Sequence, residues 1–245
     1  MPGASDDFTT EPMEQRIIAR VSRRLLPLLF LLFIICFIDR TNVGFAALQM
    51  NRDLEFGPAV YGLGAGIFFL GYALFEVPSN LILARVGARR WIARIAMTWG
   101  VIAAATMFVR SRASFYLMRL LLGVAEAGFS PGIVYYLAHW FPEQQRGRAL
   151  SRFTIAVPLA NGLGGPLGAA LLGMDGRLGL AGWQWLFLVE GLPAVVLGLI
   201  TVRYLTDRPE DAKWLAPRDR EWLDADSTGS TATGRAGPTP PCARP

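Results

Sequence analysis

Apolar residues in this chain are gathered into long runs that are separated by short polar segments. A helix needs about 20 consecutive apolar residues to cross the hydrocarbon layer of a bilayer. Six runs come close to or exceed that length, at residues 25–47, 59–84, 91–109, 113–138, 153–174 and 183–205. The pattern therefore predicts an all-α membrane protein in which six transmembrane helices form one bundle.

The segments outside these runs divide the chain further. We expect an N-terminal tail at residues 1–22, the six-helix bundle at residues 23–206, and a segment with a short surface helix at residues 207–223. Residues 224–245 are rich in Ser, Thr, Gly and Pro, which predicts a disordered tail. A truncated or frame-shifted gene would explain the composition of that tail.

Composition and charge support a membrane protein and orient its helices. Apolar residues make up 53% of the 245 residues, and charged residues only 18%. The net charge of +5 does not indicate a nucleic-acid partner, because the arginines follow the loops: eleven precede the first run or lie in the loops on its side, and four lie in the opposite loops. By the positive-inside rule, both the N-terminal tail and the segment at residues 207–223 are expected in the cytoplasm.

Four ionisable residues lie inside these apolar runs, with Asp39 and Arg40 in the first run and Arg119 and Glu126 in the fourth. A charge at the bilayer centre costs about 2.5 to 3.5 kcal/mol on insertion scales, so it is retained where it faces a partner, a water-filled path or a substrate. At a rise of about 1.5 Å per residue, Asp39 and Arg119 should lie at a similar depth, and Glu126 about 10 Å nearer the cytoplasm.

Two interpretations of these charges remain open. Asp39 could pair with Arg40 or Arg119 as a structural lock. Alternatively, the two arginines could clamp a carboxylate through bidentate hydrogen bonds while buried carboxylates carry protons. A lock does not require acids and bases at two depths, so we favour a binding site.

Other polar positions are weaker signals. Tyr72, Glu76 and Asn80 recur every four residues and predict a second polar stripe on one helix. Glu190 lies near the outer end of the sixth run, where a carboxylate can stabilise a helix N-terminus, so we interpret it as structural. His139, at the cytoplasmic end of the fourth run, is interpreted as an interfacial residue rather than a proton carrier.

Six short segments, in chain order, match a known family. They are residues 38–45 (IDRTNVGF), 71–80 (GYALFEVPSN), 85–90 (RVGARR), 119–126 (RLLLGVAE), 140–149 (WFPEQQRGRA) and 182–191 (GWQWLFLVEG). Together they resemble the N-terminal half of major facilitator superfamily transporters, and within these the anion:cation symporters that move organic acids such as tartrate, galactonate, glucarate, phthalate and hydroxyphenylacetate. The resemblance covers about residues 20–223.

The resemblance implies roles for five residues inside the bundle. In similar transporters, two arginines contact the substrate carboxylate, and these correspond to Arg40 and Arg119. Tyr72 matches an aromatic residue of the substrate pocket. Asp39 and Glu126 match proton-coupling positions.

The loop after the second run resembles the cytoplasmic gating signature of the superfamily through Arg85, Gly87 and Arg89. In the family an acidic residue precedes this signature. Ala84 stands in its place here, which removes one partner of the charge lock that normally closes the cytoplasmic gate.

The implied function is proton-coupled symport of an organic anion, such as a sugar acid, a dicarboxylate or an aromatic carboxylate, across the bacterial inner membrane. No cofactor and no metal are expected. Similar transporters have two six-helix halves with the substrate between them, so the expected partners are the anion, protons, the bilayer, and either the missing C-terminal half or a second copy.

Two other functional classes fit the sequence less well than transport does. A non-transporting membrane protein that pairs with or regulates a full-length transporter is the alternative, but it would not need the buried charges. An enzyme is not expected, since the sequence shows no catalytic His, Cys or Ser constellation, no metal-ligand spacing and no phosphate-binding glycine loop.

Overall fold

The computed structural model describes residues 13–223, so the expected disordered tail at residues 224–245 lies outside the described part of the chain, as do residues 1–12. The helices follow in the order α1 (Met13–Asp53), α2 (Pro58–Val86), α3 (Ala88–Ala105), α4 (Arg112–Glu126), α5 (Phe129–Trp140), α6 (Glu143–Leu172) and α7 (Gly182–Tyr204), with short 3-10 helices at Thr106–Phe108, Arg177–Gly179 and Pro209–Asp211.

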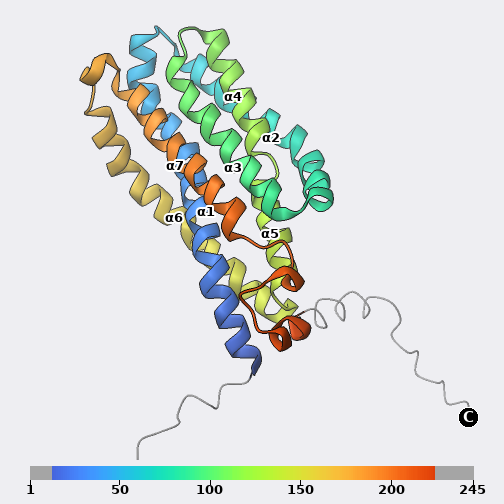
Figure 1. Ribbon diagram of the computed structural model, residues 1–245. Helices are drawn as coiled ribbons and strands as arrows, with labels where there is room; N and C mark the ends of the chain where they lie inside the picture. The colour runs from blue at the N-terminus through green and yellow to red at the C-terminus, as the bar shows by residue number, and fades with distance from the viewer. Residues whose placement is uncertain (1–12, 224–245) are drawn as a thin grey trace, which may run out of the picture.

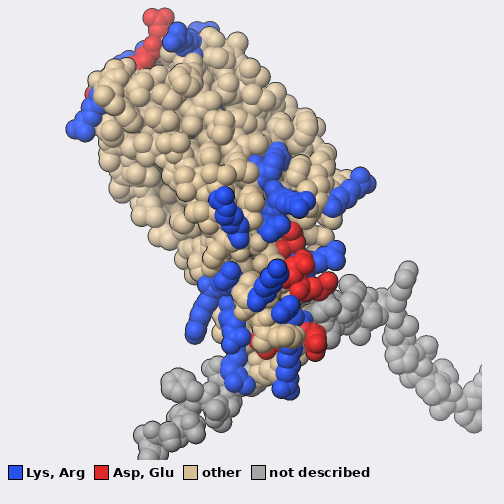
Figure 2. Space-filling model, viewed as in Figure 1, with Lys and Arg blue, Asp and Glu red and all other residues tan. Residues whose placement is uncertain are grey.

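These helices form six spans that are long and apolar enough to cross a membrane, which confirms the fold predicted from the apolar runs. The fourth span combines α4 and α5, and the third combines α3 with the 3-10 turn that follows it. Helices α1 and α6 begin, and α7 ends, at the same end of the bundle (Figure 1). Basic side chains gather there (Figure 2), and we call it the arginine-rich end.

The fourth span differs from its prediction, because it is not one continuous helix. Helix α4 ends at Glu126, and α5 begins at Phe129 after Gly128 adopts a left-handed conformation with φ of 83°. Gly128 supplies the left-handed turn, and Pro131 lies in the first turn of α5, where its missing N–H needs no intrahelical partner. Proline alone does not break the spans, since Pro78, Pro166 and Pro193 lie inside continuous helices. A bulky residue at Gly128 would be strained in this conformation. The break therefore lies directly after Glu126.

Close helix contacts through glycine hold the bundle together. The most extensive contacts join α3 to α7, α2 to α4, and α1 to α6. A Cβ atom on Gly100 of α3 would lie 2.6 Å from the carbonyl oxygen of Gly191 in α7. A Cβ atom on Gly123 of α4 would overlap the carbonyl oxygen of Phe68 in α2. These pairs need glycine because the backbones themselves are in contact.

Two spans are covered much less than the others. Only 22% of the most apolar stretch of α2 and 28% of that of α6 is buried, against 39% to 56% for the other spans. Large apolar side chains of α2, such as Phe69, Leu74 and Val77, are exposed. Gly62 and Gly66 of the same helix have no described atom within 4 Å of the Cβ position. These faces are suited to contact lipid or another apolar protein surface.

The segment after α7 folds back onto the arginine-rich end. Trp214 stacks on Trp140 of α5, with ring centroids 5.7 Å apart. Leu215 and Leu223 are buried there, and residues 217–223 are helical. Apolar anchoring therefore holds this segment against the end of the fourth span.

Candidate functional site

Four buried or half-buried charges come together between α1 and α4, even though they are up to 87 positions apart in the sequence. Asp39, Arg119 and Glu126 have only 3%, 4% and 0% of their surface exposed. Arg40 is half-buried, with 20% of its side chain exposed. Asp39 and Arg40 are adjacent on α1, while Arg119 and Glu126 are two turns apart on α4 and share one face of that helix. The expected polar stripe on the fourth span therefore faces the first span.

The only ion pair of this cluster within residues 13–223 joins Arg40 to Glu126. The Nε atom of Arg40 donates to Oε2 of Glu126 at 2.8 Å. The Sγ atom of Cys36 donates to the same oxygen at 3.6 Å. A structural lock between Asp39 and one of the arginines was the alternative from sequence, and neither arginine pairs with Asp39 in the described ion pairs. Arg40 is next to Asp39 in the chain, and its long side chain reaches Glu126, which is expected nearer the cytoplasm.

Asp39 and Arg119 belong to the cluster, but neither forms an ion pair within the described residues. Asp39 interacts electrostatically with Glu126, Arg119 and Arg40. The guanidinium of Arg119 lies over the ring of Phe68, 4.6 Å from its centroid. An aromatic face attracts a cation, and this attraction is stronger away from water. Arg119 therefore contacts an aromatic ring, and no carboxylate lies within ion-pair distance of it in the described residues.

Tyr72 forms an aromatic wall of the site. The Arg40 guanidinium lies 4.9 Å from the centroid of the Tyr72 ring. It also lies 5.8 Å from the ring centroid of Phe68. The structure therefore brings together Arg40, Arg119 and Tyr72, the three residues expected to contact substrate. Their roles stay predictions.

Several polar atoms of the cluster are buried without a described hydrogen-bond partner. These atoms are Oδ2 of Asp39, Nη2 of Arg40, Nε of Arg119 and Oε1 of Glu126. Most buried polar groups in proteins are hydrogen-bonded, and groups that are not often mark functional sites. The cluster therefore offers two donors and two acceptors in close proximity, which suits an anion together with protons.

Glu190 was interpreted from sequence as a structural residue at a helix end, but it belongs to the same buried layer. It lies in the interior of α7, with 4% of its surface exposed, and its Oε1 accepts a hydrogen bond from Nδ2 of Asn42 on α1. It also interacts electrostatically with Asp39. The Asn42 side chain, one turn beyond Asp39 in an apolar run, was the sequence signal that could have suggested a partner for Glu190.

The expected gating loop lies at the arginine-rich end and has an acidic partner that sequence reasoning missed. Asp207, just after α7, accepts a hydrogen bond from the backbone N–H of Arg89 at 2.7 Å. Its other oxygen lies 3.6 Å from Nε of the same residue. A Cβ atom on Gly87, whose φ is 98°, would come within 2.9 Å of Asp207. An acid from the end of α7 therefore binds the loop in which Ala84 replaces the usual acid, while Arg85 is exposed.

His139 is exposed at the end of α5, and its Nδ1 lies 2.9 Å from the carbonyl oxygen of Tyr135 in its own helix. Within residues 13–223, no group of three or more His, Cys, Asp or Glu side chains is placed to hold a metal ion.

Comparison with known proteins identifies the family. The sequence model of the Major Facilitator Superfamily matches residues 29–240. A relative from Agrobacterium vitis named "Putative tartrate transporter" is 53% identical over 218 residues, which are 89% of this chain and 49% of the relative. A relative from Pseudomonas putida named "Putative metabolite transport protein NicT" is 51% identical over 89% of this chain and 50% of its own length. The chain thus spans about half the length of these curated relatives.

A solved structure supports the fold. The bacterial homologue of the human lysosomal transporter Spinster, in an inward-facing and unoccupied conformation, aligns with a TM-score of 0.71 at 22% identity, over 83% of this chain and 47% of that one. At this identity the likeness shows the fold alone. The six spans correspond to one half of the longer protein.

Proposed function

The chain belongs to the major facilitator superfamily, and we propose that it forms the N-terminal half of a proton-coupled symporter of organic anions. The observation that carries this proposal is the buried cluster of two arginines and two carboxylates between α1 and α4. Charges this deep in a membrane protein are costly and mark transport pathways more often than they mark packing. The polar atoms that lack partners supply both halves of the chemistry, anion binding and proton binding.

The proposed ligands of the anion are Arg40 and Arg119. Both guanidiniums lie against the Phe68 ring, that of Arg40 from α1 and that of Arg119 from α4. A guanidinium binds a carboxylate through two parallel hydrogen bonds, and the interaction is strong where water is scarce. Tyr72, stacked against Arg40, closes one side of the site. We assign these three residues to the substrate.

Coupling follows from competition for Arg40. Its Nε is bound to Glu126, so a substrate carboxylate that takes this donor deprives Glu126 of its cation. A buried carboxylate left without a partner is expensive, and it becomes neutral by taking a proton. Anion and proton then bind together, which is positive coupling between two sites. Asp39 is the second acid of this scheme, since its charge acts on both Glu126 and Arg119.

The substrate class is proposed from the site and from the names of the relatives. Two arginines suit a small acid with a carboxylate and neighbouring hydroxyl groups, and the Agrobacterium vitis relative is named for tartrate. Sugar acids, dicarboxylates and aromatic carboxylates all satisfy the same donors. Tartrate is therefore the first probe.

The proposed partner is a second six-helix half. Transporters of this type bind substrate between two halves that rock against each other. Helices α2 and α6, which are the least covered spans, offer the surface for that contact. A second copy of the chain is the other candidate for this surface. Either partner would cover the exposed apolar side chains of α2.

We also propose a bacterial inner-membrane location with both termini in the cytoplasm, supported by the basic side chains at one end of the bundle (Figure 2). Cysteine labelling tests this in a background without native cysteines. Gly147→Cys, at the arginine-rich end, should react with an impermeant reagent only after permeabilisation. Arg177→Cys, at the opposite end, should react in intact cells. The reverse pattern would contradict the orientation.

Transport is tested by pairing the chain with a separate C-terminal half. The 245-residue chain is produced together with the C-terminal half of the Agrobacterium vitis relative and reconstituted in proteoliposomes with a pH gradient and labelled tartrate. We expect saturable, gradient-driven uptake from the pair and none from the monomeric chain. Binding of the two halves without uptake of tartrate or of a panel of sugar and aromatic acids would favour the non-transporting, regulatory alternative.

A matched pair of variants assigns the uptake to the cluster. Arg119→Gln removes the buried guanidinium, and Arg112→Gln makes the same change at the exposed start of α4. Uptake should be lost in the first variant and retained in the second. Equal uptake by both variants would show that Arg119 does not contact the anion.

A further inference from the structure

At the arginine-rich end, the first turns of α1 and α6 enclose a cavity of about 390 Å³ that shares no residue with the buried charge cluster. Arg23 of α1 and Arg148 and Arg152 of α6 line it, together with neutral polar side chains such as Ser22 and Gln145. No acidic side chain is among the described lining residues. The cavity is therefore a basic site on the outside of the bundle, and the proposed transport function leaves it unused.

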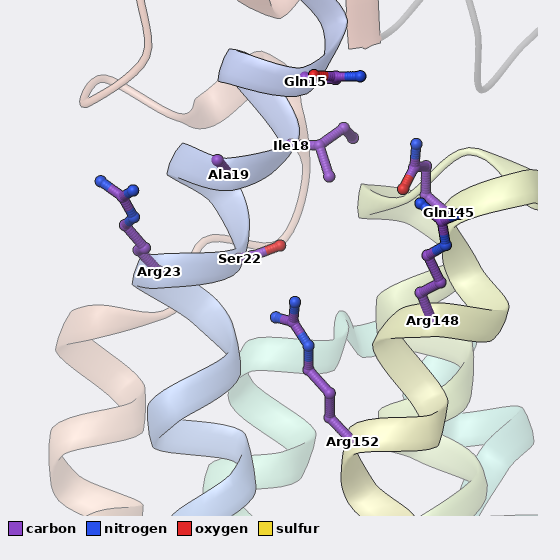
Figure 3. Close-up of a pocket in the computed structure, with 8 residues that line it drawn as sticks. All are labelled: Gln15, Ile18, Ala19, Ser22, Arg23, Gln145, Arg148 and Arg152. Carbon is purple, nitrogen blue, oxygen red and sulfur yellow. The ribbon is translucent and has the colours of Figure 1, made fainter.

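Some of the lining side chains point into the gap between the two helices, and others lie at its edge (Figure 3). Arg152 extends from α6 toward α1, and the Ser22 hydroxyl points toward α6. Arg148 runs along α6 to lie beside Gln145. Arg23 lies at the rim of the gap with its guanidinium directed outward. All three arginines are exposed, so their long side chains are free to turn toward a bound group.

The depth of these arginines matches that of lipid phosphates. The apolar runs of the two helices begin at residues 25 and 153. At about 1.5 Å per residue, Arg23, Arg148 and Arg152 lie within about 8 Å of the hydrocarbon edge. The polar layer on each side of a bilayer is about 5 to 8 Å thick. The three guanidiniums are therefore expected in the headgroup layer.

The positive charge of the cavity favours an anionic headgroup. None of the three arginines takes part in an ion pair within the described residues. A phosphate would gain charge-assisted hydrogen bonds from the guanidiniums and further bonds from the Ser22 hydroxyl. A choline or ethanolamine group would find no described carboxylate to pair with.

We propose that this cavity binds the phosphate of an anionic phospholipid, with phosphatidylglycerol as the model ligand, from the leaflet that surrounds the arginine-rich end. The acyl chains of such a lipid follow the apolar surfaces of α1 and α6 into the bilayer. A lipid bound there bridges the two helices through their first turns, because Arg23 comes from one helix and Arg148 and Arg152 from the other. The site is independent of substrate transport.

Native mass spectrometry of the purified 245-residue chain in detergent tests this. The chain is titrated with phosphatidylglycerol and with phosphatidylcholine of identical acyl chains. A hydrogen bond to a charged group contributes about tenfold or more to affinity where it forms. We therefore expect phosphatidylglycerol to bind at least about tenfold more tightly than phosphatidylcholine. The triple variant Arg23→Gln, Arg148→Gln and Arg152→Gln should bind the two lipids about equally.

A charge-matched control separates the cavity from diffuse attraction. Arg85→Gln, Arg90→Gln and Arg203→Gln remove three exposed arginines near the same end but outside the cavity, and their phosphatidylglycerol affinity should stay within about twofold of wild type. Equal losses in both triple variants would overturn the proposal in favour of diffuse charge. Equal affinity for the two lipids in wild type would also overturn it. Displacement of the lipid by equimolar inorganic phosphate or tartrate would show a soluble-anion site instead.

Discussion

Two arginine–carboxylate pairs in this molecule differ in depth, and their surroundings differ accordingly. Arg40 and Glu126 pair at 2.8 Å in the middle of the bundle, with 20% and 0% of their side chains exposed. Arg89 and Asp207 pair at 3.6 Å at the arginine-rich end, with 34% and 26% exposed. Water can replace a lost partner at the end of the bundle but not in the middle. Loss of one partner is therefore expected to cost much more for the buried pair than for the partly exposed pair.

The largest effect should come from breaking the buried pair. Arg40→Met leaves Glu126 buried without its cation, and removing one partner of a buried pair costs about 3 to 5 kcal/mol. Thermal unfolding in detergent should show a large loss of stability, and uptake by the paired halves should be abolished. The double variant Arg40→Met with Glu126→Leu should recover much of the stability but no uptake, because the lone charge is gone and the anion ligand is still missing. Failure of the double variant to recover stability would show that the pair does not act as a unit.

The second effect should appear in coupling alone. Glu126→Gln keeps the size of the side chain and an oxygen that can accept from Arg40, but it cannot exchange a proton. Uphill uptake driven by a pH gradient should be lost, while exchange of labelled for unlabelled tartrate continues and depends less on pH. Counterflow and gradient-driven uptake in the same proteoliposomes measure the two activities. Uphill uptake by this variant would sink the assignment of Glu126, and Asp39→Asn in the same assays tests the other acid.

The third effect concerns packing around the site. Gly123→Val would push a side chain into the backbone of α2 at Phe68, and overpacking of this kind costs about 1 to 3 kcal/mol. Gly62→Val is the matched control, because it makes the same change in a helix interior where the Cβ position has no neighbour within 4 Å. The melting temperature of the chain should fall clearly in the first variant and change little in the second. Similar melting temperatures would show that α2 and α4 can separate without cost.

Sequence patterns predict this fold well because each span has to match the bilayer by itself. Run length alone indicates six spans, and the depth of Asp39 and Arg119 follows from a fixed rise per residue. The pairing of Arg40 with Glu126 could not be predicted in the same way, since it depends on how α1 and α4 pack and on how far an arginine side chain reaches. The same limit applies to Glu190, whose partner Asn42 is on a distant helix.

The break in the fourth span is a different case, because its residues are visible in the sequence but do not decide the outcome. Gly128 followed by Pro131 is compatible with an interruption, yet Gly191 and Pro193 lie inside the continuous helix α7. Run length hides such a break, since it measures apolarity and not backbone hydrogen bonding. The role of Asp207 could not be predicted from the sequence. It lies in a polar segment, and only the fold of the chain after α7 brings it to Arg89.

The smallest effect should come from the pair at the arginine-rich end. Asp207→Asn keeps an oxygen for the backbone N–H of Arg89 and removes only the charge, and a partly exposed ion pair is worth about 1 kcal/mol or less. Glu210→Gln makes the same charge change in the same segment, at a carboxylate that is 57% exposed and 4.0 Å from Arg208. We expect Asp207→Asn to lower the melting temperature by about 2 to 4 °C and Glu210→Gln to leave it unchanged. Because salt screens exposed charges, the difference should shrink at high ionic strength, whereas the loss caused by Arg40→Met should not. A loss for Asp207→Asn as large and as salt-independent as that for Arg40→Met would mean that depth does not separate the two pairs.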